Sequence, residues 1–256
     1  NQYLWLHLYC KVNLKTNNME HIKKFLKPVL ILVFMVAVFS CKNNKTEKVE
    51  EPEMMEKPEM AMPEFKPFKV ITIKHKVADY AKWRKEYDAH DSVRLAYGIT
   101  HFVIGRGMDD PNTIIVIDKI NDVMKAKEFS ALPSLKEAMK KAGVMGKPEF
   151  GFYDVIRNDD SKINLKDRLM VMHRVKDFDA WLKVYEAEGM TKRMEEGLID
   201  RGMARSLDDP NMVTLVFAIS DMKKAKTSIN SEAKKKLMMD AGVEGAPQMF
   251  YYRLVN

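Results

Sequence analysis

The chain has 256 residues, 46% of them hydrophobic and 31% charged, and a formal net charge of +7. Five of the 43 Lys and Arg and one of the 36 Asp and Glu precede Cys41, so the chain beyond Cys41 carries only +3, with both signs mixed. This balance argues against nucleic acid as a partner. The two cysteines, Cys10 and Cys41, leave no disulfide and no catalytic thiol for the rest of the chain.

The N-terminal part resembles the signal of a bacterial lipoprotein. Met19 precedes three lysines and an apolar run, Val29 to Phe39, that is shorter than the roughly 20 residues of a membrane span. The run ends in Val-Phe-Ser-Cys at Cys41, which is similar to a lipobox. We therefore expect residues 1–18 to be mis-called upstream sequence, 19–40 to be a signal peptide, and Cys41 to carry the lipid. A plain transmembrane anchor is the alternative.

These features predict a location in the bacterial cell envelope, on the periplasmic or cell-surface side, with the membrane as partner through the lipid anchor. Residues 41–66 are rich in Lys, Glu and Pro and lack an apolar period. Such a composition is typical of a flexible tether.

The remaining sequence is a tandem duplication. The string His75-x-Val-x-Asp-Tyr-x-x-Trp83 returns 98 residues later as His173-x-Val-x-Asp-Phe-x-x-Trp181. After a slip of one residue the offset is 99, and Asp-Asp-Pro-Asn at 109–112 returns at 208–211. The two copies cover residues 67–157 and 167–256.

Each copy predicts the same series of elements. In the first copy a strand at Phe68–Val77 is followed by a helix from the N-cap Asp79 to about Leu95. Strands at Ile99–Arg106 and Thr113–Asp118 come next, joined by the Asp-Asp-Pro-Asn turn. A second helix runs from the N-cap Asp122 to Gly143 with a break at Pro133, and a strand at Glu149–Ile156 ends the copy. The order β-α-β-β-α-β is that of the ferredoxin-like unit.

The third strand of each copy predicts how the copies pack. Residues 113–117 and 213–217 are apolar without alternation, which indicates burial on both faces of the sheet. The helices cover one face, so the sheet of the other copy is the simplest cover for the second. The predicted fold class is α+β, with two ferredoxin-like repeats packed as an intramolecular barrel.

These motifs, together with the string Ala-Gly-Val-x-Gly-x-Pro that closes each copy, resemble the dimeric α/β-barrel superfamily and, within it, the antibiotic-biosynthesis-monooxygenase group. The resemblance covers both copies and implies a barrel closed within one chain. It implies a fold more firmly than an activity, because the superfamily includes cofactor-free oxygenases, haem degraders, cyclases and stress proteins. The second copy departs from the first at residues 231–235, where Lys234 replaces Leu135.

Two histidines are candidates for catalysis. By strand parity His75 shares an apolar face with Ile71, Ile73 and Val77, and His173 lies in the matching place. An apolar environment lowers the pKa of an imidazole, which could then act as a base. The two histidines could also pair across the pseudo-two-fold, or each could be a structural residue hydrogen-bonded at the end of its strand. The sequence offers no metal-ligand cluster beside them.

Aromatic and basic residues complete the candidate ligand site. Trp83, Tyr87, Trp181 and Tyr185 lie on one face of a helix, as the wall of a pocket or as a core stripe. Arg106 and Arg205, like Arg94 and Arg193, could hold an acidic ligand group, pair with Asp109 and Asp208, or cap helix carbonyls. His101 stands where the second copy has Asp200 and gives the first copy more titratable groups.

The leading hypothesis is a lipid-anchored protein that binds a small aromatic or apolar molecule in a helix–sheet cleft. The first alternative is a cofactor-free monooxygenase or isomerase with His75 or His173 as the base. The second is an interaction module without a pocket. No cofactor and no metal are expected.

Overall fold

The computed structural model describes residues 65–255. The predicted signal peptide, the lipidation site Cys41 and nearly all of the tether lie outside these residues. Among the helices of residues 65–255, none is both long enough and apolar enough to cross a membrane.

The two repeats contain the same elements. The first consists of β1 (Phe68–Val77), α1 (Tyr80–Ala89), α2 (Asp91–Ala96), β2 (Ile99–Gly107), β3 (Thr113–Ile120), α3 (Val123–Ala131), α4 (Pro133–Lys141) and β4 (Val144–Asn158). The second consists of β5 (Asp167–Val175), α5 (Phe178–Glu188), α6 (Met190–Glu195), β6 (Leu198–Ser206), β7 (Met212–Ile219), α7 (Met222–Ile229), α8 (Glu232–Asp240) and β8 (Val243–Val255).

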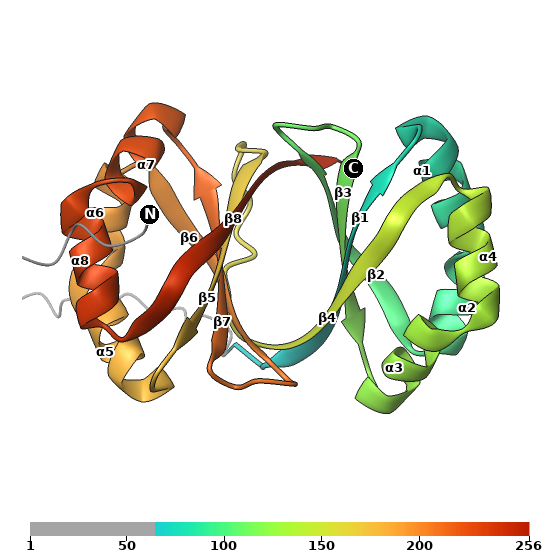
Figure 1. Ribbon diagram of the computed structural model, residues 1–256, viewed down its shortest axis with the longest axis horizontal. Coiled ribbons are helices and arrows are strands. Elements are labelled where there is room, and N and C mark those ends of the chain that lie inside the picture. Colours follow the sequence, from blue (N-terminus) through green and yellow to red (C-terminus); the bar gives the residue numbers. More distant parts are fainter. Residues whose placement is uncertain (1–64, 256) are drawn as a thin grey trace, which may run out of the picture. The chain divides into compact units, whose positions relative to one another are not determined.

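The eight strands close into one antiparallel barrel in the order β1-β3-β2-β8-β5-β7-β6-β4. The repeats meet at two seams, β2 with β8 and β4 with β6. Helices α1–α4 cover the outside of one half and α5–α8 the outside of the other (Figure 1). Every strand has both edges paired within residues 68–255, so this part of the chain supplies all the pairing that its sheet needs. The predicted intramolecular barrel is confirmed.

Local signals set the helix boundaries. Asp79 caps α1 by accepting from the Lys82 amide at 2.6 Å, and Asp122 caps α3 in the same manner. The predicted break at Pro133 separates α3 from α4. One prediction was wrong: the first helix of the repeat is not continuous to Leu95 but is interrupted at His90. In the second repeat the interruption falls at Gly189, whose φ of 81° suits glycine.

Three hydrophobic clusters form the core. Two lie between the sheet and the helices of each repeat, and the third fills the barrel interior. Strand β3 contributes to two of them, because Ile114 and Val116 face the helices while Ile115 and Ile117 face the interior. The predicted burial of this strand on both faces is confirmed, with the sheet of the other repeat as its cover.

Close packing at a seam fixes how the halves meet. A Cβ atom at Gly105 in β2 would lie 2.1 Å from Cδ2 of Tyr252 in β8, so only glycine allows this approach. Tyr252 is itself fully buried in the interior cluster.

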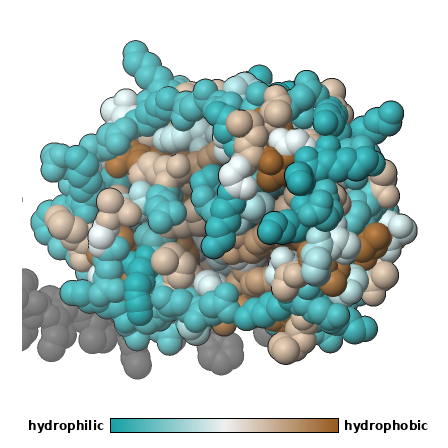
Figure 2. Space-filling model, turned by 45° about the vertical axis from the view of Figure 1, so that its right-hand side comes forward, coloured by the Kyte–Doolittle hydropathy of each residue, from teal (hydrophilic) through white to brown (hydrophobic). Residues whose placement is uncertain are grey.

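On the face shown in Figure 2, hydrophilic side chains are prominent, and hydrophobic atoms gather in the hollows between them.

Candidate functional site

Each repeat carries a stack of aromatic rings on its first helix. The ring centroids of Trp83 and Tyr87 are 5.2 Å apart at 25°, and those of Trp181 and Tyr185 are 5.3 Å apart at 22°. The indole of Trp83 also lies against the imidazole of His75, with 5.5 Å between centroids. The sequence left open whether these rings form a core stripe or a pocket wall, and they do both: the tryptophans are buried, and all four rings border small cavities.

Arginines close both ends of the stack. The guanidinium carbon of Arg94 lies 3.7 Å from the ring centre of Tyr87, and that of Arg106 lies 4.1 Å from the ring centre of Tyr80. Arg94 donates to the carbonyl oxygen of Tyr87 at 2.7 Å, which agrees with the predicted helix cap. Arg193 repeats this role in the second repeat.

Of the alternatives for the other two arginines, ion pairs with Asp109 and Asp208 are wrong. Arg106 donates to the carbonyl oxygen of Pro111 at 2.8 Å, and Arg205 donates to that of Pro210 at 2.7 Å. Their guanidinium groups lie over Tyr80 and Phe178, outside the cavities that the tryptophans border. Each of these arginines therefore links the outer end of an aromatic stack to the Asp-Asp-Pro-Asn turn of its repeat.

A buried carboxylate lies at the inner end of the stack. In the first repeat Asp118 of β3 is fully buried and accepts from the Tyr87 hydroxyl at 3.1 Å. Burial and the neighbouring Asp118 raise the pKa of Tyr87. His101 lies beside them, 3.0 Å from the same hydroxyl, with 41% of its side chain exposed, and it does not border the cavity.

In the second repeat this carboxylate has moved to the opposite strand. Asp200 occupies the place of His101 on β6, and Phe217 occupies that of Asp118 on β7. Asp200 accepts from the Tyr185 hydroxyl at 3.0 Å and from Arg193 at 2.6 and 2.8 Å. His101 and Asp118 of the first repeat thus belong to a packed network and do not line its cavity.

His75 and His173 are buried to 6% and 5% exposure, and neither ring nitrogen of either residue has a hydrogen-bond partner within residues 65–255. The expected hydrogen bonds at the strand ends are therefore wrong. So is pairing across the pseudo-two-fold, because the histidines line separate cavities. Burial lowers the pKa of each imidazole to about 4, so both are neutral at pH 7.

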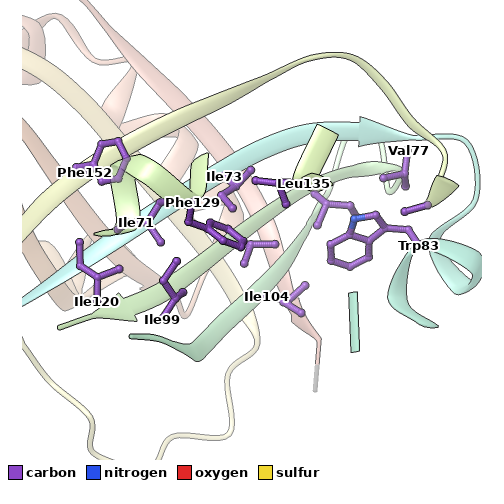
Figure 3. Packing of buried hydrophobic residues seen from close by; sticks show 14 residues of the cluster. Ile71, Ile73, Val77, Trp83, Ile99, Ile104, Ile120, Phe129, Leu135 and Phe152 are labelled. Carbon is purple, nitrogen blue, oxygen red and sulfur yellow. The ribbon is translucent and has the colours of Figure 1, made fainter. Parts of the chain in front are cut away.

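Both histidines face a cavity between helices and sheet, and the two cavities differ in size. That of the first repeat measures about 50 Å³ and that of the second about 90 Å³. Leu135 of α4 is buried in the first repeat and packs in one cluster with Trp83, Ile73 and Val77 (Figure 3). Its counterpart Lys234 puts no apolar side chain in this place, so the apolar plug that Leu135 forms in the first repeat is missing. This accounts for the wider second cavity.

Lys234 belongs to a polar group at the rim of this cavity. Its ammonium donates to the carboxylates of Glu188 and Glu196, the latter at 2.7 Å, and Arg193 lies 3.5 Å from Glu188. The helix that carries it, α8, has no buried residue. Lys234 was not predicted as a site residue. Its signal was the departure of residues 231–235 from the first copy, which also marks the larger cavity.

The site offers an apolar pocket, a neutral imidazole and a rim of compensated charges. Within residues 65–255 no three His, Cys, Asp or Glu side chains gather closely enough to hold a metal ion.

No family model and no curated protein matches this chain. Solved structures do match. An anthrone oxidase-like protein is 11% identical, covers 74% of this chain and 92% of its own, and has a TM-score of 0.50. A ferredoxin-fold protein from Listeria monocytogenes, related to antibiotic biosynthesis monooxygenases, is 10% identical, with coverages of 75% and 97% and a TM-score of 0.43. A monooxygenase-like protein from Listeria innocua is also 10% identical, with coverages of 74% and 96% and a TM-score of 0.43.

At this level of identity the likeness identifies a fold and not an activity. The closed eight-stranded barrel and the internal repeat agree with it. The predicted resemblance is confirmed at the level of the fold: the chain forms an eight-stranded α/β barrel from two ferredoxin-like repeats within a single polypeptide.

Proposed function

We propose that this protein binds a small, neutral aromatic molecule in the helix–sheet cavity of its second repeat. The observation that carries the proposal is the lack of hydrogen-bond partners at His173. An imidazole with two unpartnered nitrogens, buried in an apolar cavity beside Trp181, lacks the hydrogen bonds that buried polar groups normally make. A ligand with one hydroxyl or carbonyl group would supply one.

The chemistry of the cavity favours a neutral ligand. His173 is neutral at pH 7, because burial lowers its pKa to about 4, and a neutral imidazole presents one donor and one acceptor. Around the rim, Lys192, Arg193 and Lys234 are matched in charge by Glu188, Glu196 and Asp200. An ionic ligand would thus meet no uncompensated charge in this group. An aromatic hydroxyl next to Trp181 satisfies both the imidazole and the apolar lining.

The volume of the cavity requires its cover to move. About 90 Å³ is less than the ~150 Å³ of an engineered protein cavity that binds benzene. Leu237 and Met238 of α8 line the cavity from the outside, and α8 buries none of its residues. We infer that α8 shifts outward when the ligand enters.

Tryptophan fluorescence tests the proposal for each repeat separately. From residue 42 onward the chain contains two tryptophans, Trp83 and Trp181, one beside each cavity. The variant Trp83→Phe therefore reports the second cavity, and Trp181→Phe reports the first. We expect 4-bromophenol to quench Trp181 with saturation, and bromobenzene, which lacks the hydroxyl, to bind about fivefold more weakly, since a neutral hydrogen bond contributes ~1 kcal/mol.

Two further substitutions identify the contacts. His173→Phe in the Trp83→Phe background should remove the preference for the phenol, and Lys234→Leu, which restores the apolar plug of the first repeat, should abolish saturable quenching. Quenching that rises linearly with concentration, or that is equal for both tryptophans, would contradict a specific site in the second repeat.

A second candidate function is catalysis by the same imidazole. His173 has a free nitrogen beside the cavity, as a proton acceptor requires. With a pKa near 4 it is a weak base, and within residues 65–255 no side chain hydrogen-bonds to it to orient the ring. Binding therefore has more support than cofactor-free oxygenation or isomerisation. The two cavities also weigh against an interaction module without a pocket.

We further propose that the protein is held on the bacterial envelope by a lipid on Cys41. Support comes from the basic residues, the short apolar run and the Val-Phe-Ser-Cys string that precede the tether. Cys41→Ser should move the protein from the membrane fraction to the soluble or uncleaved precursor pool. Mass analysis of the mature N-terminal peptide would show whether an acyl group is present.

A further inference from the structure

A cavity larger than those at the two histidines lies in the barrel interior. It measures about 250 Å³, against about 90 Å³ for the second-repeat cavity. Its wall comes from both repeats and is mainly apolar, with Val70, Ile117 and Val155 facing Met170 and Val216. A protein interior is normally packed to a density that leaves few voids larger than a water molecule. A space of this size at the centre of the barrel therefore needs an explanation.

One buried cation lines this cavity without a counter-ion. Arg168 of β5 is only 7% exposed. One of its terminal nitrogens donates to the carbonyl oxygens of Leu165 and Asp167 at 2.8 and 3.1 Å, and it makes no ion pair with any residue from 65 to 255. Burial lowers the pKa of this guanidinium. Its position in the first repeat is occupied by Val70, so the charge is a feature of one repeat only.

The charged residues Arg201 and Asp167, which lie near Arg168, form ion pairs with other residues. Arg201 borders the same cavity but is held by Asp159 at 2.7 Å and by the carbonyl oxygen of Ser161 at 2.7 Å. Asp167 is engaged by Arg253 at 2.6 Å. The buried hydroxyl of Thr214 also lines the cavity, beside the hydroxyl of Tyr153. The interior thus combines an apolar wall with one buried cation that has no counter-ion, while the exposed Asp160 stands at its edge.

We propose that the barrel interior is a second binding site, which takes an apolar monocarboxylate with its anionic group on Arg168. A buried guanidinium without a counter-ion is costly, and a carboxylate is the group that matches its planar donors. Asp160 at the cavity mouth disfavours ligands with more than one negative charge. Scaled from the ~150 Å³ cavity that holds benzene, the volume suits a molecule of roughly ten non-hydrogen atoms.

Octanoate and 1-octanol are matched probes for this site, because they share a chain and differ in charge. Isotope-labelled methionine methyl groups report where they bind: Met170 lines the barrel interior, and Met238 lines the second-repeat cavity. With the chain from residue 42 onward, we expect octanoate to shift the Met170 resonance with saturation. We expect 1-octanol to bind at least tenfold more weakly.

Variants test the role of Arg168. Arg168→Met should weaken octanoate at least tenfold and leave 1-octanol unchanged, whereas Arg168→Lys should retain most of the preference for the acid. Arg174→Met is the matched control on the same strand, because Arg174 is half-exposed and paired with Asp209 and Glu244, and it should have no effect. An unchanged Met238 resonance shows that each variant is folded.

A filling substitution provides a test independent of charge. A Cβ atom at Gly202 would make only ordinary contacts, 3.5 Å from the carbonyl oxygen of Arg157 and 3.9 Å from Val216. Gly202→Val, which copies Val103 of the first repeat, should therefore fold and block octanoate. The proposal would be overturned if octanoate and 1-octanol bound equally well, or if Arg168→Met left octanoate binding unchanged. It would also be overturned if octanoate shifted Met238 instead of Met170, or did not bind at millimolar concentration. His173→Phe should leave octanoate binding intact, so the two sites can fail independently.

Discussion

At the scale of single residues, the buried histidines are the least compensated groups of the helix–sheet cores. Each lies against a tryptophan, and neither finds a hydrogen-bond partner in the described chain. Sequence parity placed both on the apolar face correctly. It could not predict their missing partners, because a hydrogen bond depends on side chains that approach from other elements. The same limit applies to Arg106 and Arg205, which stack on rings and bind turn carbonyls instead of the nearby aspartates.

The depressed pKa values predict how stability depends on pH. In the unfolded chain a histidine has a pKa near 6.5, and in the folded protein His75 and His173 have values of about 4. The unfolded state thus binds more protons between these values. The stabilisation of the folded state that results from this difference is complete above pH 6.5. It is lost as the pH falls toward 4, and the loss in the free energy of unfolding is about 3 kcal/mol per histidine.

Urea unfolding at pH 7.5 and pH 4.5 measures this loss. The double variant His75→Phe/His173→Phe should lose less stability than the natural protein over this interval, and each single variant should show about half the difference. Carboxylate protonation affects all forms alike and cancels in the comparison. Identical pH dependence in all four proteins would show that the imidazoles are hydrated or paired in solution.

At the scale of elements, the two copies of the last helix behave differently. Helix α4 buries Leu135, whereas α8 has Lys234 at that position and buries none of its residues. Both helices have nine residues and follow a residue in an extended conformation, but only α4 buries a side chain in the core. The duplicated sequence made this comparison possible, but the cavity under α8 follows only from how the helix packs.

Hydrogen exchange tests the weaker anchorage of α8. Amides of Glu232–Asp240 should exchange roughly tenfold faster than those that follow Pro133 in α4, because fewer buried contacts oppose local opening. Helices α3 and α7 serve as an internal reference, since each buries two residues. A saturating 4-bromophenol concentration should slow exchange in α8 selectively. Equal protection of α4 and α8 without ligand would contradict a movable cover.

At the scale of the whole molecule, each repeat has a sheet face that it cannot bury alone. Val70, Ile115, Ile117 and Val155 of the first repeat face the barrel interior and are covered by the second repeat. Two seams join the halves, and at one of them Gly105 admits the ring of Tyr252. The duplication therefore replaces a second chain as the partner of each sheet.

The first repeat in isolation tests this account. Residues 65–160 should form a homodimer, in which β2 and β4 of one copy pair with β4 and β2 of the other, because the exposed apolar face would otherwise meet water. Light scattering after gel filtration measures the mass. Ile117→Lys places a charge on the covered face and should prevent dimerisation. A folded monomer that does not bind hydrophobic dyes would refute the need for a covering sheet.

The sequence by itself determined the duplication, the order of elements, the caps at Asp79 and Asp122, and the need to cover both faces of the third strand, because these depend on local chemistry and on periodicity. Only the tertiary structure decided which cavity is larger, that the carboxylate changes strand between Asp118 and Asp200, and that Arg168 faces the barrel interior without a counter-ion. Each of these depends on side chains from distant segments that meet only when the barrel closes, and that meeting is not encoded in the spacing of any one segment.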